Sequence, residues 1–483
     1  MKRTKLFLLP VLLLGLAACN KSSGGGEEVS KAKIVFWHTF GQKPLAALQN
    51  KVDSFVKLVK DNEGVEVEVE LDYQGGYNDM PQKVTTGIAT GDMPTIGVAY
   101  ADHVANYMSA EAGEAGKYVV NLDKYINDSD LTFGKDKYLG DNEGVNDIIQ
   151  SYLDEGRQMP REGTYLMPYM KSTEIMIYNL TAAKKLMEYV HPEVPAGKVK
   201  EYMSTITWDD LMELAQAAVD HKSEVSSELE YPVYYDSDSN LFITELYQKN
   251  IGYSSIGSNG KGQIDFESGE ALTKAKAVVT SLKQAHDAKL LTTKGTEGTY
   301  SSDNFKSAKT LFSIGSTGGT GYTIPDAGSF EVAFAKVPTM GAEDRVAYIS
   351  QGPSLCFFHN PSLSEAQNDL NLKYAWKLVK YITSKQVNVS LCVTGSEGYS
   401  PVRNSCYTTE TYSDFIEEGE SYAEAALVTQ NDINGRYFNS AVFTGSATLR
   451  TQVGAIITSV FTDKNTVDDA FSAAINAAKK DIK

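Results

Sequence analysis

The side chains that could do chemistry in this sequence gather where apolar runs end. They form seven polar and aromatic clusters, at residues 37–38, 73–77, 100–102, 169–173, 313–319, 350–352 and 398–403. In open α/β sheets, ligands lie beyond the carboxyl ends of the strands, which is where such clusters fall. Aromatic faces stack on sugar rings, while hydroxyl, amide and backbone N–H groups orient a polar ligand. Taken singly, each cluster is more typical of turn chemistry.

The candidate ligand-binding residues are the aromatic, polar and smallest members of these clusters. His38 follows a tryptophan at the end of an apolar run, and a satisfied imidazole at a loop edge is an equally good interpretation of it. Glycine at the candidate positions would let the backbone approach a ligand closely. The full set is Trp37, His38, Tyr77, Tyr100, Asp102, Tyr169, Ser172, Ser316, Thr317, Gly318, Gln351, Gly352, Tyr399 and Arg403.

No motif of a known enzyme class accompanies these clusters. The sequence has no GxSxG elbow, no HExxH, no P-loop and no GxGxxG after a strand. Its histidines have no metal-ligand spacing, so no catalytic residue, metal or cofactor is expected. Acidic residues are abundant, and a glycosidase-like carboxylate pair cannot be recognised from spacing alone. A surface-anchored glycan hydrolase therefore remains an alternative from another class.

Composition narrows the class of ligand. The chain has 483 residues, and its 45 basic against 62 acidic residues give a net charge of −17. A protein that grips nucleic-acid phosphates needs a basic face, so nucleic acid is not an expected partner. Tyrosine is unusually frequent, with 28 residues against 18 Phe and 3 Trp. Rings with a polar tip suit the recognition of polyhydroxylated ligands.

The first thirty residues predict export and anchoring. Residues 1–18 combine a basic start with a short apolar run, which is typical of a secretory signal peptide and too short for a membrane span. They end before Cys19 in a segment that looks like a bacterial lipobox, which predicts lipidation of Cys19. Residues 19–30 are Gly- and Ser-rich and predict a flexible tether. Cys392 and Cys406 either form a disulfide or, with Cys356, remain buried thiols.

Hydrophobic periodicity predicts an α/β body. Strands are expected at 33–38, 65–71 and 95–100, separated by helices at 44–60 and 77–90. Thr207 is a candidate N-cap for a helix that runs to residue 220. Further helices are expected at 271–288, 372–383 and 467–482, whereas 224–262 reads as loop-rich apart from the apolar residues 241–243.

Several segments together resemble the family 1 extracellular solute-binding proteins, the receptors of ABC importers for sugars and glycerol-3-phosphate. The resemblance covers nearly all of the chain after the leader. It is carried, in this order, by residues 33–38, 167–179, 207–211, 375–384 and 398–403. It implies a two-lobed periplasmic-binding-protein-like fold, in which the lobes close on a small ligand through a hinge. It also implies ABC permease subunits as partners and an extracytoplasmic, lipid-anchored monomer.

The resemblance also implies particular ligand contacts. The glycerol-3-phosphate subgroup would place them at Tyr77, Ser172, Ser316, Gly352 and Tyr399. Tyr100 stands where that subgroup has a glutamate, and its phosphate-binding arginine has no clear counterpart, although Arg436 and Arg450 lie nearby. A ring in place of a carboxylate favours a sugar or oligosaccharide. A glycerol-3-phosphate or glycerophosphodiester ligand remains the alternative within the family.

The expected lobes each use two stretches of chain. The N-terminal lobe is expected to comprise residues 31–150 and 305–365, and the C-terminal lobe residues 151–304 and 366–483.

Overall fold

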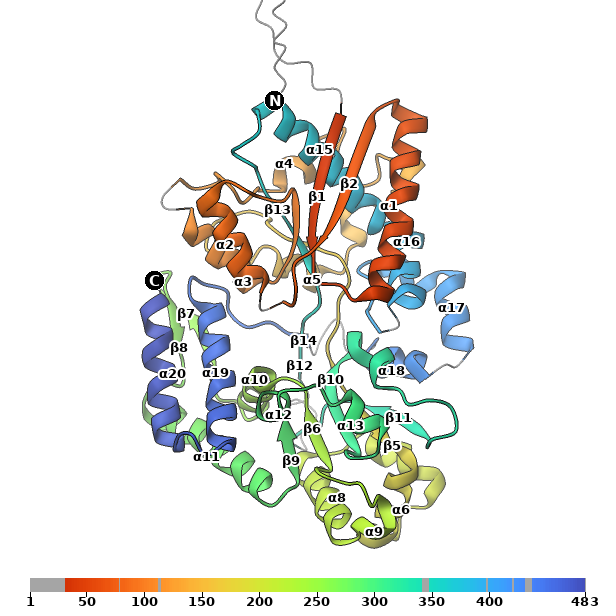
Figure 1. Cartoon of the computed structure of the whole chain (residues 1–483), viewed down its shortest axis with the longest axis vertical. Coiled ribbons are helices and arrows are strands. Elements are labelled where there is room, and N and C mark those ends of the chain that lie inside the picture. Colours follow the sequence, from red (N-terminus) through yellow and green to blue (C-terminus); the bar gives the residue numbers. More distant parts are fainter. Residues whose placement is uncertain are drawn as a thin grey trace, which may run out of the picture.

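Two lobes stacked along the long axis make up the molecule (Figure 1). The structure is a computed structural model that describes residues 31–482, except 78, 112–113, 341–346, 397, 419–420 and 431–436. The predicted signal peptide, Cys19 and the tether lie outside the described residues. Among the described residues, no helix is long and apolar enough to cross a membrane.

The first lobe is built on a five-stranded mixed sheet with the order β2-β1-β3-β13-β4. β1 pairs in parallel with β2 and β3, and β13 runs antiparallel to β3 and β4. Alternate side chains of β1, Ala32, Ile34 and Phe36, are completely buried in the core of this lobe. The strands are β1 (Lys31–His38), β2 (Glu66–Tyr73), β3 (Ile96–Ala99), β4 (Met167–Pro168) and β13 (Ser354–Phe357), and the larger helices are α1 (Gln42–Glu63), α2 (Met80–Thr90), α3 (Ala101–Ala110) and α15 (Glu365–Ile382).

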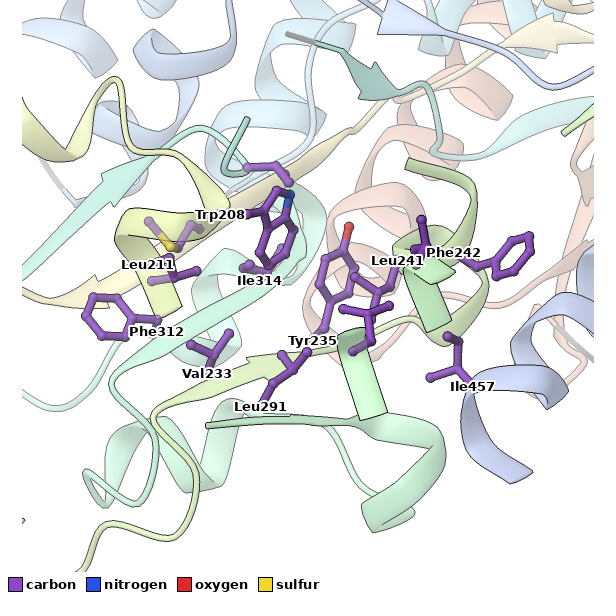
Figure 2. Close-up of a cluster of buried hydrophobic side chains, with 14 of the residues drawn as sticks. Trp208, Leu211, Val233, Tyr235, Leu241, Phe242, Leu291, Phe312, Ile314 and Ile457 are labelled. Atoms are coloured by element: carbon purple, nitrogen blue, oxygen red, sulfur yellow. The ribbon is translucent and has the colours of Figure 1, made fainter. Parts of the chain in front are cut away.

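The second lobe has its own five-stranded sheet, with the order β11-β5-β10-β6-β9. Figure 2 shows its core, where Tyr235, Phe312 and Ile314 of the sheet meet Trp208 and Phe242 of the surrounding helices. The strands are β5 (Glu174–Asn179), β6 (Val233–Tyr235), β9 (Leu291–Thr293), β10 (Phe312–Ser316) and β11 (Val332–Ala335), and the larger helices are α6 (Leu180–Val190), α8 (Trp208–Asp220), α10 (Asp238–Gln248), α11 (Gly269–Asp287), α19 (Ser446–Phe461) and α20 (Val467–Asp481).

Shorter elements complete both lobes and the connections between them. They are α4 (Asp123–Ile126), α5 (Gln150–Glu155), α7 (Val199–Met203), β7 (Ser254–Ile256), β8 (Gly262–Ile264), α9 (Lys222–Val225), α12 (Lys294–Glu297), α13 (Ser302–Lys306), α14 (Thr320–Thr323), β12 (Tyr348–Ile349), α16 (Lys385–Val389), α17 (Glu410–Glu417), α18 (Ser421–Gln430) and β14 (Tyr437–Phe438). The predicted α/β class and two-lobed architecture are confirmed.

The predicted N-cap of α8 is confirmed as a complete capping box. Thr207 Oγ1 accepts a hydrogen bond from Asp210 N at 3.2 Å, and Thr207 N donates to Asp210 Oδ2 at 3.0 Å. Two of the backbone donors that a helix start leaves without partners are thereby satisfied, which fixes where α8 begins.

The prediction that 224–262 is loop-rich is wrong for part of that segment. It contains β6, the hairpin of β7 and β8, and the helix α10. Nine of the eleven α10 residues are buried, including the polar residues Asn240, Glu245 and Gln248. A helix buried on nearly every side shows no clear amphipathic period, so sequence pattern could not reveal it.

The predicted division of the chain between the lobes is wrong in three stretches. β4, within 151–304, pairs with β13 in the first lobe. β10 and β11, within 305–365, pair with β5 in the second lobe. α15, within 366–483, packs on β1 in the first lobe, where Trp376 is fully buried and stacks on Tyr125 with ring centroids 5.6 Å apart. Each stretch belongs to the lobe whose sheet or core it packs against. That packing joins segments far apart in the sequence, and the order of the segments does not reveal it.

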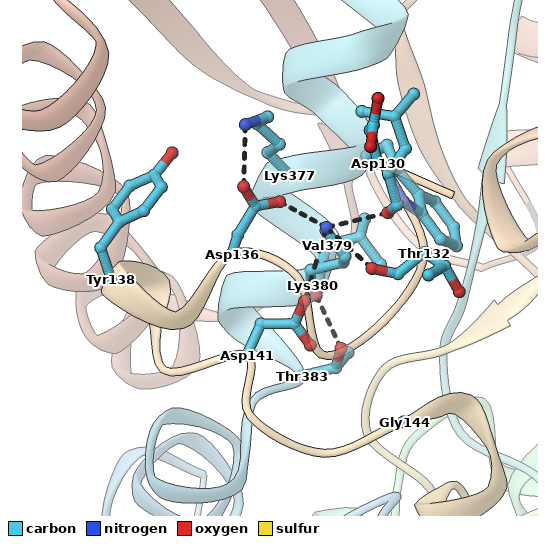
Figure 3. Close-up of polar contacts among 12 residues, drawn as sticks. Asp130, Thr132, Asp136, Tyr138, Asp141, Gly144, Lys377, Val379, Lys380 and Thr383 are labelled. Atoms are coloured by element: carbon cyan, nitrogen blue, oxygen red, sulfur yellow. Dashed lines mark hydrogen bonds and ion pairs between the residues drawn. The ribbon is translucent and has the colours of Figure 1, made fainter. Parts of the chain in front are cut away.

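A buried group of charges holds the loop at 131–147 against α15 (Figure 3). Lys377 Nζ donates to Asp136 Oδ1 at 2.9 Å, and Lys380 forms an ion pair with the other oxygen of Asp136. Lys380 Nζ also donates to Leu131 O at 2.8 Å. Burial would raise the pKa of Asp136, but its two lysine partners outweigh burial and lower it.

Among the described residues, three segments of chain cross between the lobes. The first, 169–173, joins β4 to β5, the second, 350–353, leads into β13, and the third, 398–409, leads from the first lobe toward α17 and α18. Lys171 bridges to Ser400 and Ser172 bridges to Gln351 in short antiparallel pairs. The three crossings therefore lie side by side and form the connection about which the lobes could move.

Candidate ligand-binding site

The crossing segments place several predicted site residues next to one another. Ser172 N donates to Gln351 O at 2.8 Å, and Gln351 N donates back to Ser172 O at 3.0 Å. Ser316 Oγ lies 3.3 Å from Ser172 Oγ, and Thr317 N donates to Thr173 O at 2.8 Å. The end of β10 is thereby joined to the first crossing.

Gly352 is required by the geometry of the crossings. Its φ is +96°, and a Cβ there would lie 2.6 Å from Ser172 N and 2.7 Å from Met170 O. A side chain at this position would therefore push two of the crossings apart. Gly352 serves the connection between the lobes, a role that does not need a ligand.

Tyrosines from different elements meet where the lobes face each other. The rings of Tyr77 and Tyr100, both from the first lobe, have centroids 5.0 Å apart. Tyr399, on the third crossing, lies over Gly318 of the second lobe, where a Cβ would come within 2.7 Å of its ring. Burial raises the pKa of Tyr77, Tyr100 and Tyr399. The neighbouring phenols raise the pKa of Tyr100 and Tyr399 further, whereas the hydrogen bond with Tyr399 acts against burial at Tyr77.

His103 lies next to this cluster of tyrosines. Its ring meets that of Tyr100 edge-on, with centroids 5.3 Å apart. The side chain of Asp102 accepts from His103 N at 2.9 Å and so shapes the first turn of α3. Within the described part of the chain, His103 Nδ1 is buried and has no hydrogen-bond partner. Burial lowers the pKa of His103, with Asp102 acting against it, so the ring favours its neutral form.

A polar network from the second lobe lies close to the tyrosines. Glu174 Oε1 accepts from Asn240 Nδ2 at 2.7 Å, and Asn240 Nδ2 also lies 3.2 Å from Gln351 Oε1. Arg450, on α19, donates from Nη2 to Asn240 Oδ1. The charge of Arg450 opposes the rise that burial causes in the pKa of Tyr100, and it adds to the lowering of the pKa of His103. The helix α19, which carries Arg450, packs against α3 of the first lobe.

The two lobes touch at points away from the crossings. Gly445 N, at the start of α19, donates to Asn106 Oδ1 of α3 at 3.3 Å. Tyr322 OH of the second lobe lies 2.8 Å from where a Cβ of Gly41 would stand in the first lobe. The structure therefore shows the lobes in contact with each other.

Three predicted site residues serve the fold, while Trp37, like Tyr77 and Tyr399, is partly buried against the core of the first lobe. His38 is buried, and its Nδ1 accepts from Phe40 N at 3.2 Å, as the alternative interpretation had it. Tyr169 is fully buried in the core of the first lobe, and Trp37 packs against that core. Arg403 is fully buried and donates from Nε to Thr383 O at 2.5 Å and from Nη1 to Gly144 O at 3.1 Å. Its Nη1 also lies 3.6 Å from Asp147 Oδ2 and its Nη2 4.0 Å from Asp141 Oδ1, so Arg403 belongs to the charged groups of the first lobe.

Sequence reasoning missed several residues that the fold brings to this site. Asn240 and Glu174 lie in buried segments with no visible motif, and His103 directly follows a predicted site residue without being predicted itself. Arg450 was noted from the sequence only as lying near the phosphate-binding arginine of the glycerol-3-phosphate subgroup. Arg436, noted for the same reason, lies outside the described residues. A lone buried amide or carboxyl next to an arginine leaves no mark in the spacing of a single sequence.

Three other features could mark a functional site: metal ligands, cysteines and a surface pocket. Among the described residues, no group of three or more His, Cys, Asp or Glu side chains could hold a metal ion. Cys356, Cys392 and Cys406 are free and buried. The structure therefore has three separate thiols and no Cys392–Cys406 disulfide. A surface pocket lined by Thr181, Lys184, Gly328, Phe330 and Glu331 belongs to the second lobe alone.

Two α/β lobes joined by three crossing segments, with polar and aromatic side chains between them, define a two-lobed binding protein. The chain belongs to the family of bacterial extracellular solute-binding proteins, whose family model matches residues 53–418. No curated protein sequence matches the chain significantly.

Solved structures confirm the fold. The GacH receptor of Streptomyces glaucescens, solved without ligand and with acarbose, is 18% identical with a TM-score of 0.65, and the match covers 94% of this chain and 98% of that one. UgpB from Mycobacterium tuberculosis, in complex with glycerophosphocholine, is 16% identical with a TM-score of 0.67 and coverage of 93% and 98%. Maltose-bound MalE3 of T. maritima is 14% identical with a TM-score of 0.65 and coverage of 93% and 99%.

Proposed function

We propose that this chain is the receptor of an ABC importer and captures a sugar or oligosaccharide between its lobes. The observation that carries the proposal is the group of rings where the lobes face each other: Tyr77 and Tyr100 of the first lobe have centroids 5.0 Å apart, and Tyr399 lies over Gly318 of the second lobe. Asn240 of the second lobe adds a polar network with Gln351 and Arg450. Stacked rings flanked by hydrogen-bond donors are the chemistry that a sugar requires, because its ring faces are apolar and its rim is hydroxylated.

Binding would work by stabilising the closed arrangement. A ligand held by residues of both lobes has a higher affinity for the closed form than for the open one, and only that difference shifts the equilibrium. The loaded, closed form would then dock on permease subunits in the membrane. Such a receptor needs no catalytic residue of its own.

The leader supports the proposed location. The signal-like segment 1–18, Cys19 and the Gly- and Ser-rich tether would attach the two lobes by lipid to the outer face of a membrane. A tether of this composition behaves as a flexible coil and would let a monomer reach its permease.

Arg450 favours a second ligand class, a glycerophosphodiester or glycerol-3-phosphate. A guanidinium binds phosphate in a two-pronged geometry that no uncharged side chain can match. Arg450 donates to Asn240 from Nη2, so its other N–H groups could donate to a phosphate. UgpB from Mycobacterium tuberculosis, which shares the fold, was solved with glycerophosphocholine.

A thermal-shift screen tests the proposal and separates the two ligand classes. Purified protein would be heated with maltotriose, acarbose, glycerophosphocholine or glycerol-3-phosphate at several concentrations. A ligand that binds the folded chain raises its melting temperature in proportion to the logarithm of concentration. A shift with the saccharides alone supports the sugar proposal, and a shift with the phosphate compounds alone supports the second class.

The hydrolase alternative has no support in the family or in the fold. Binding proteins make up both the matching family and the structural relatives named above. Mass spectrometry of each ligand after incubation with the protein would show whether any product forms. Recovery of unchanged ligand is the expected result.

A further inference from the structure

A chain of hydrogen bonds leads from a buried carboxyl to the proposed ligand site. Glu174 is 1% exposed, and its Oε2 accepts from Tyr235 OH at 2.5 Å while its Oε1 accepts from Asn240 Nδ2 at 2.7 Å. Asn240 is 3% exposed and makes two further hydrogen bonds. Its Nδ2 donates to Gln351 Oε1 at 3.2 Å, and its Oδ1 accepts from Arg450.

The ionised form of Glu174 fixes the direction of every bond in this chain. A carboxylate can only accept, so Asn240 must turn its amide nitrogen toward Glu174. The amide oxygen of Asn240 then faces Arg450, whose guanidinium can only donate. The same Asn240 nitrogen also donates to Gln351 Oε1. The amide nitrogen of Gln351 is buried and has no hydrogen-bond partner among the described residues, so it is free to donate to a ligand.

We propose that Glu174 and Asn240 are positioning residues that hold Arg450 and Gln351 as hydrogen-bond donors toward the ligand. The inference rests on the proposed function, since it concerns the same site. It adds that the ligand must present acceptor atoms, hydroxyl or phosphate oxygens, to these two side chains. It also makes the geometry of Arg450 depend on the charge of Glu174.

Protonation of Glu174 disturbs this arrangement. A neutral carboxyl carries one O–H that must itself donate. On Oε2 this proton would go to Tyr235 OH and leave Asn240 in place, so that Arg450 loses only the attraction of the charge. On Oε1 it would point at Asn240, which can accept it only by turning its oxygen away from Arg450. Two donors, the Asn240 amide nitrogen and the Arg450 guanidinium, would then face each other. Arg450 would lose both its acceptor and the attraction of a nearby negative charge.

The burial of Glu174 brings its pKa near neutral pH. Burial raises the pKa of Glu174 to about 7, while hydrogen bonds from Tyr235 and Asn240 and the charge of Arg450 act against burial. Asp236, which follows β6, raises the pKa further through its own negative charge. Tyr235 belongs to β6, Asp236 follows it, Asn240 comes from α10 and Arg450 from α19, while β10 pairs with Glu174 through the uncharged Ser316.

Nuclear magnetic resonance of arginine side chains tests the inference without any ligand. The protein would be labelled with nitrogen-15 in arginine only, and the Arg450 Nε–H signal would be assigned by its loss in Arg450→Lys. We expect the Arg450 signal to shift between pH 6 and 8.5 with a midpoint near pH 7. In Glu174→Gln, which cannot ionise, that transition should be absent.

Asp236→Asn is the matched control, because Asp236 is a buried carboxyl whose pKa burial raises to about 6 and which accepts hydrogen bonds from Ser301. In this variant the Arg450 transition should remain, at a somewhat lower pH. A flat Arg450 signal in the wild type, or a transition that survives in Glu174→Gln and vanishes in Asp236→Asn, would overturn the inference. Absence of a thermal shift with any saccharide or phosphate would instead count against the proposed function.

Discussion

Lys171 Nζ lies 2.5 Å from Glu155 Oε2, and the two side chains are 0% and 8% exposed. Lys171 is on the first crossing between the lobes, and Glu155 is at the end of α5. The same ammonium lies 3.3 Å from Gly352 O on the second crossing. One buried cation therefore ties two crossings to the first lobe, at the place about which the lobes would have to move.

The first prediction concerns this buried pair. Lys171→Met leaves the Glu155 carboxylate buried without its cation, and breaking such a pair typically costs about 3–5 kcal/mol. The double variant Lys171→Met with Glu155→Leu removes both charges and should recover most of that loss. Urea unfolding of the three proteins measures the difference. A single variant as stable as the wild type would contradict the role given to the pair.

The second prediction concerns Gly352. Alanine there must adopt a left-handed backbone, which costs about 1–2 kcal/mol, and must also place a Cβ within 2.7 Å of the first crossing. Gly328 is the control, since its φ of +91° is similar and a Cβ there would meet nothing within 4 Å. Gly352→Ala should therefore lower the melting temperature clearly more than Gly328→Ala. Equal losses would show that the close approach of the crossings contributes nothing.

The third prediction concerns the tyrosines between the lobes. Tyr100→Ala and Tyr399→Ala should each weaken binding of the ligand found in the screen by roughly 10- to 100-fold, because stacking and apolar burial are lost together. Trp37→Ala should weaken it as well, since Trp37 is a predicted site residue that, like Tyr399, is only partly buried against the first-lobe core. Tyr189→Ala is the control, because that ring is 42% exposed and stacks on His221 instead. Calorimetric titration measures all four affinities.

The fourth prediction concerns stability and pH. The pKa of Glu174 is about 7 when folded, against 4.5 as the ordinary value, so the folded chain holds this proton more tightly than the unfolded chain. The contribution of Glu174 to stability is therefore fully present below pH 4.5 and is lost as pH rises to about 7, with a magnitude on the order of 3 kcal/mol. Glu174→Gln should gain stability relative to the wild type between pH 5 and 8.

Melting temperatures across that pH range check the fourth prediction. The exposed Glu270, whose pKa its Lys274 partner lowers, supplies the control variant Glu270→Gln, which should run parallel to the wild type throughout. A stability difference between Glu174→Gln and the wild type that does not change with pH would mean that Glu174 stays ionised in the folded protein.

The sequence was sufficient for the elements of the first lobe and insufficient for the way distant elements combine. β1, β2 and β3 and the helices between them could be predicted because each has the apolar period of its type. The lobe assignment of β10 and α15 could not, because it depends on pairing with β5 and β1, far away in the chain.

The candidate site was predictable to a similar degree. Tyr77, Tyr100 and Tyr399 were predicted because rings at the ends of apolar runs have few roles other than turns and ligands. The fold brings them to where the lobes face each other, and their contact with a ligand stays a prediction. Arg403 stood in an equally polar cluster, yet the fold buries it against Thr383 and Gly144. Asn240 and Glu174 could not be found, since a buried amide beside a buried carboxyl is visible only once helix and sheet have been placed together.

The most direct test of ligand capture between the lobes is a calorimetric titration of the wild type and of Tyr100→Ala/Tyr399→Ala with the best ligand from the screen, followed by mass spectrometry of that ligand. We expect one ligand per wild-type chain, recovery of the ligand unchanged, and binding by the double variant that is at least about 100-fold weaker at an undiminished melting cooperativity. Equal affinity of the two proteins, or conversion of the ligand to a product, would contradict the proposed function.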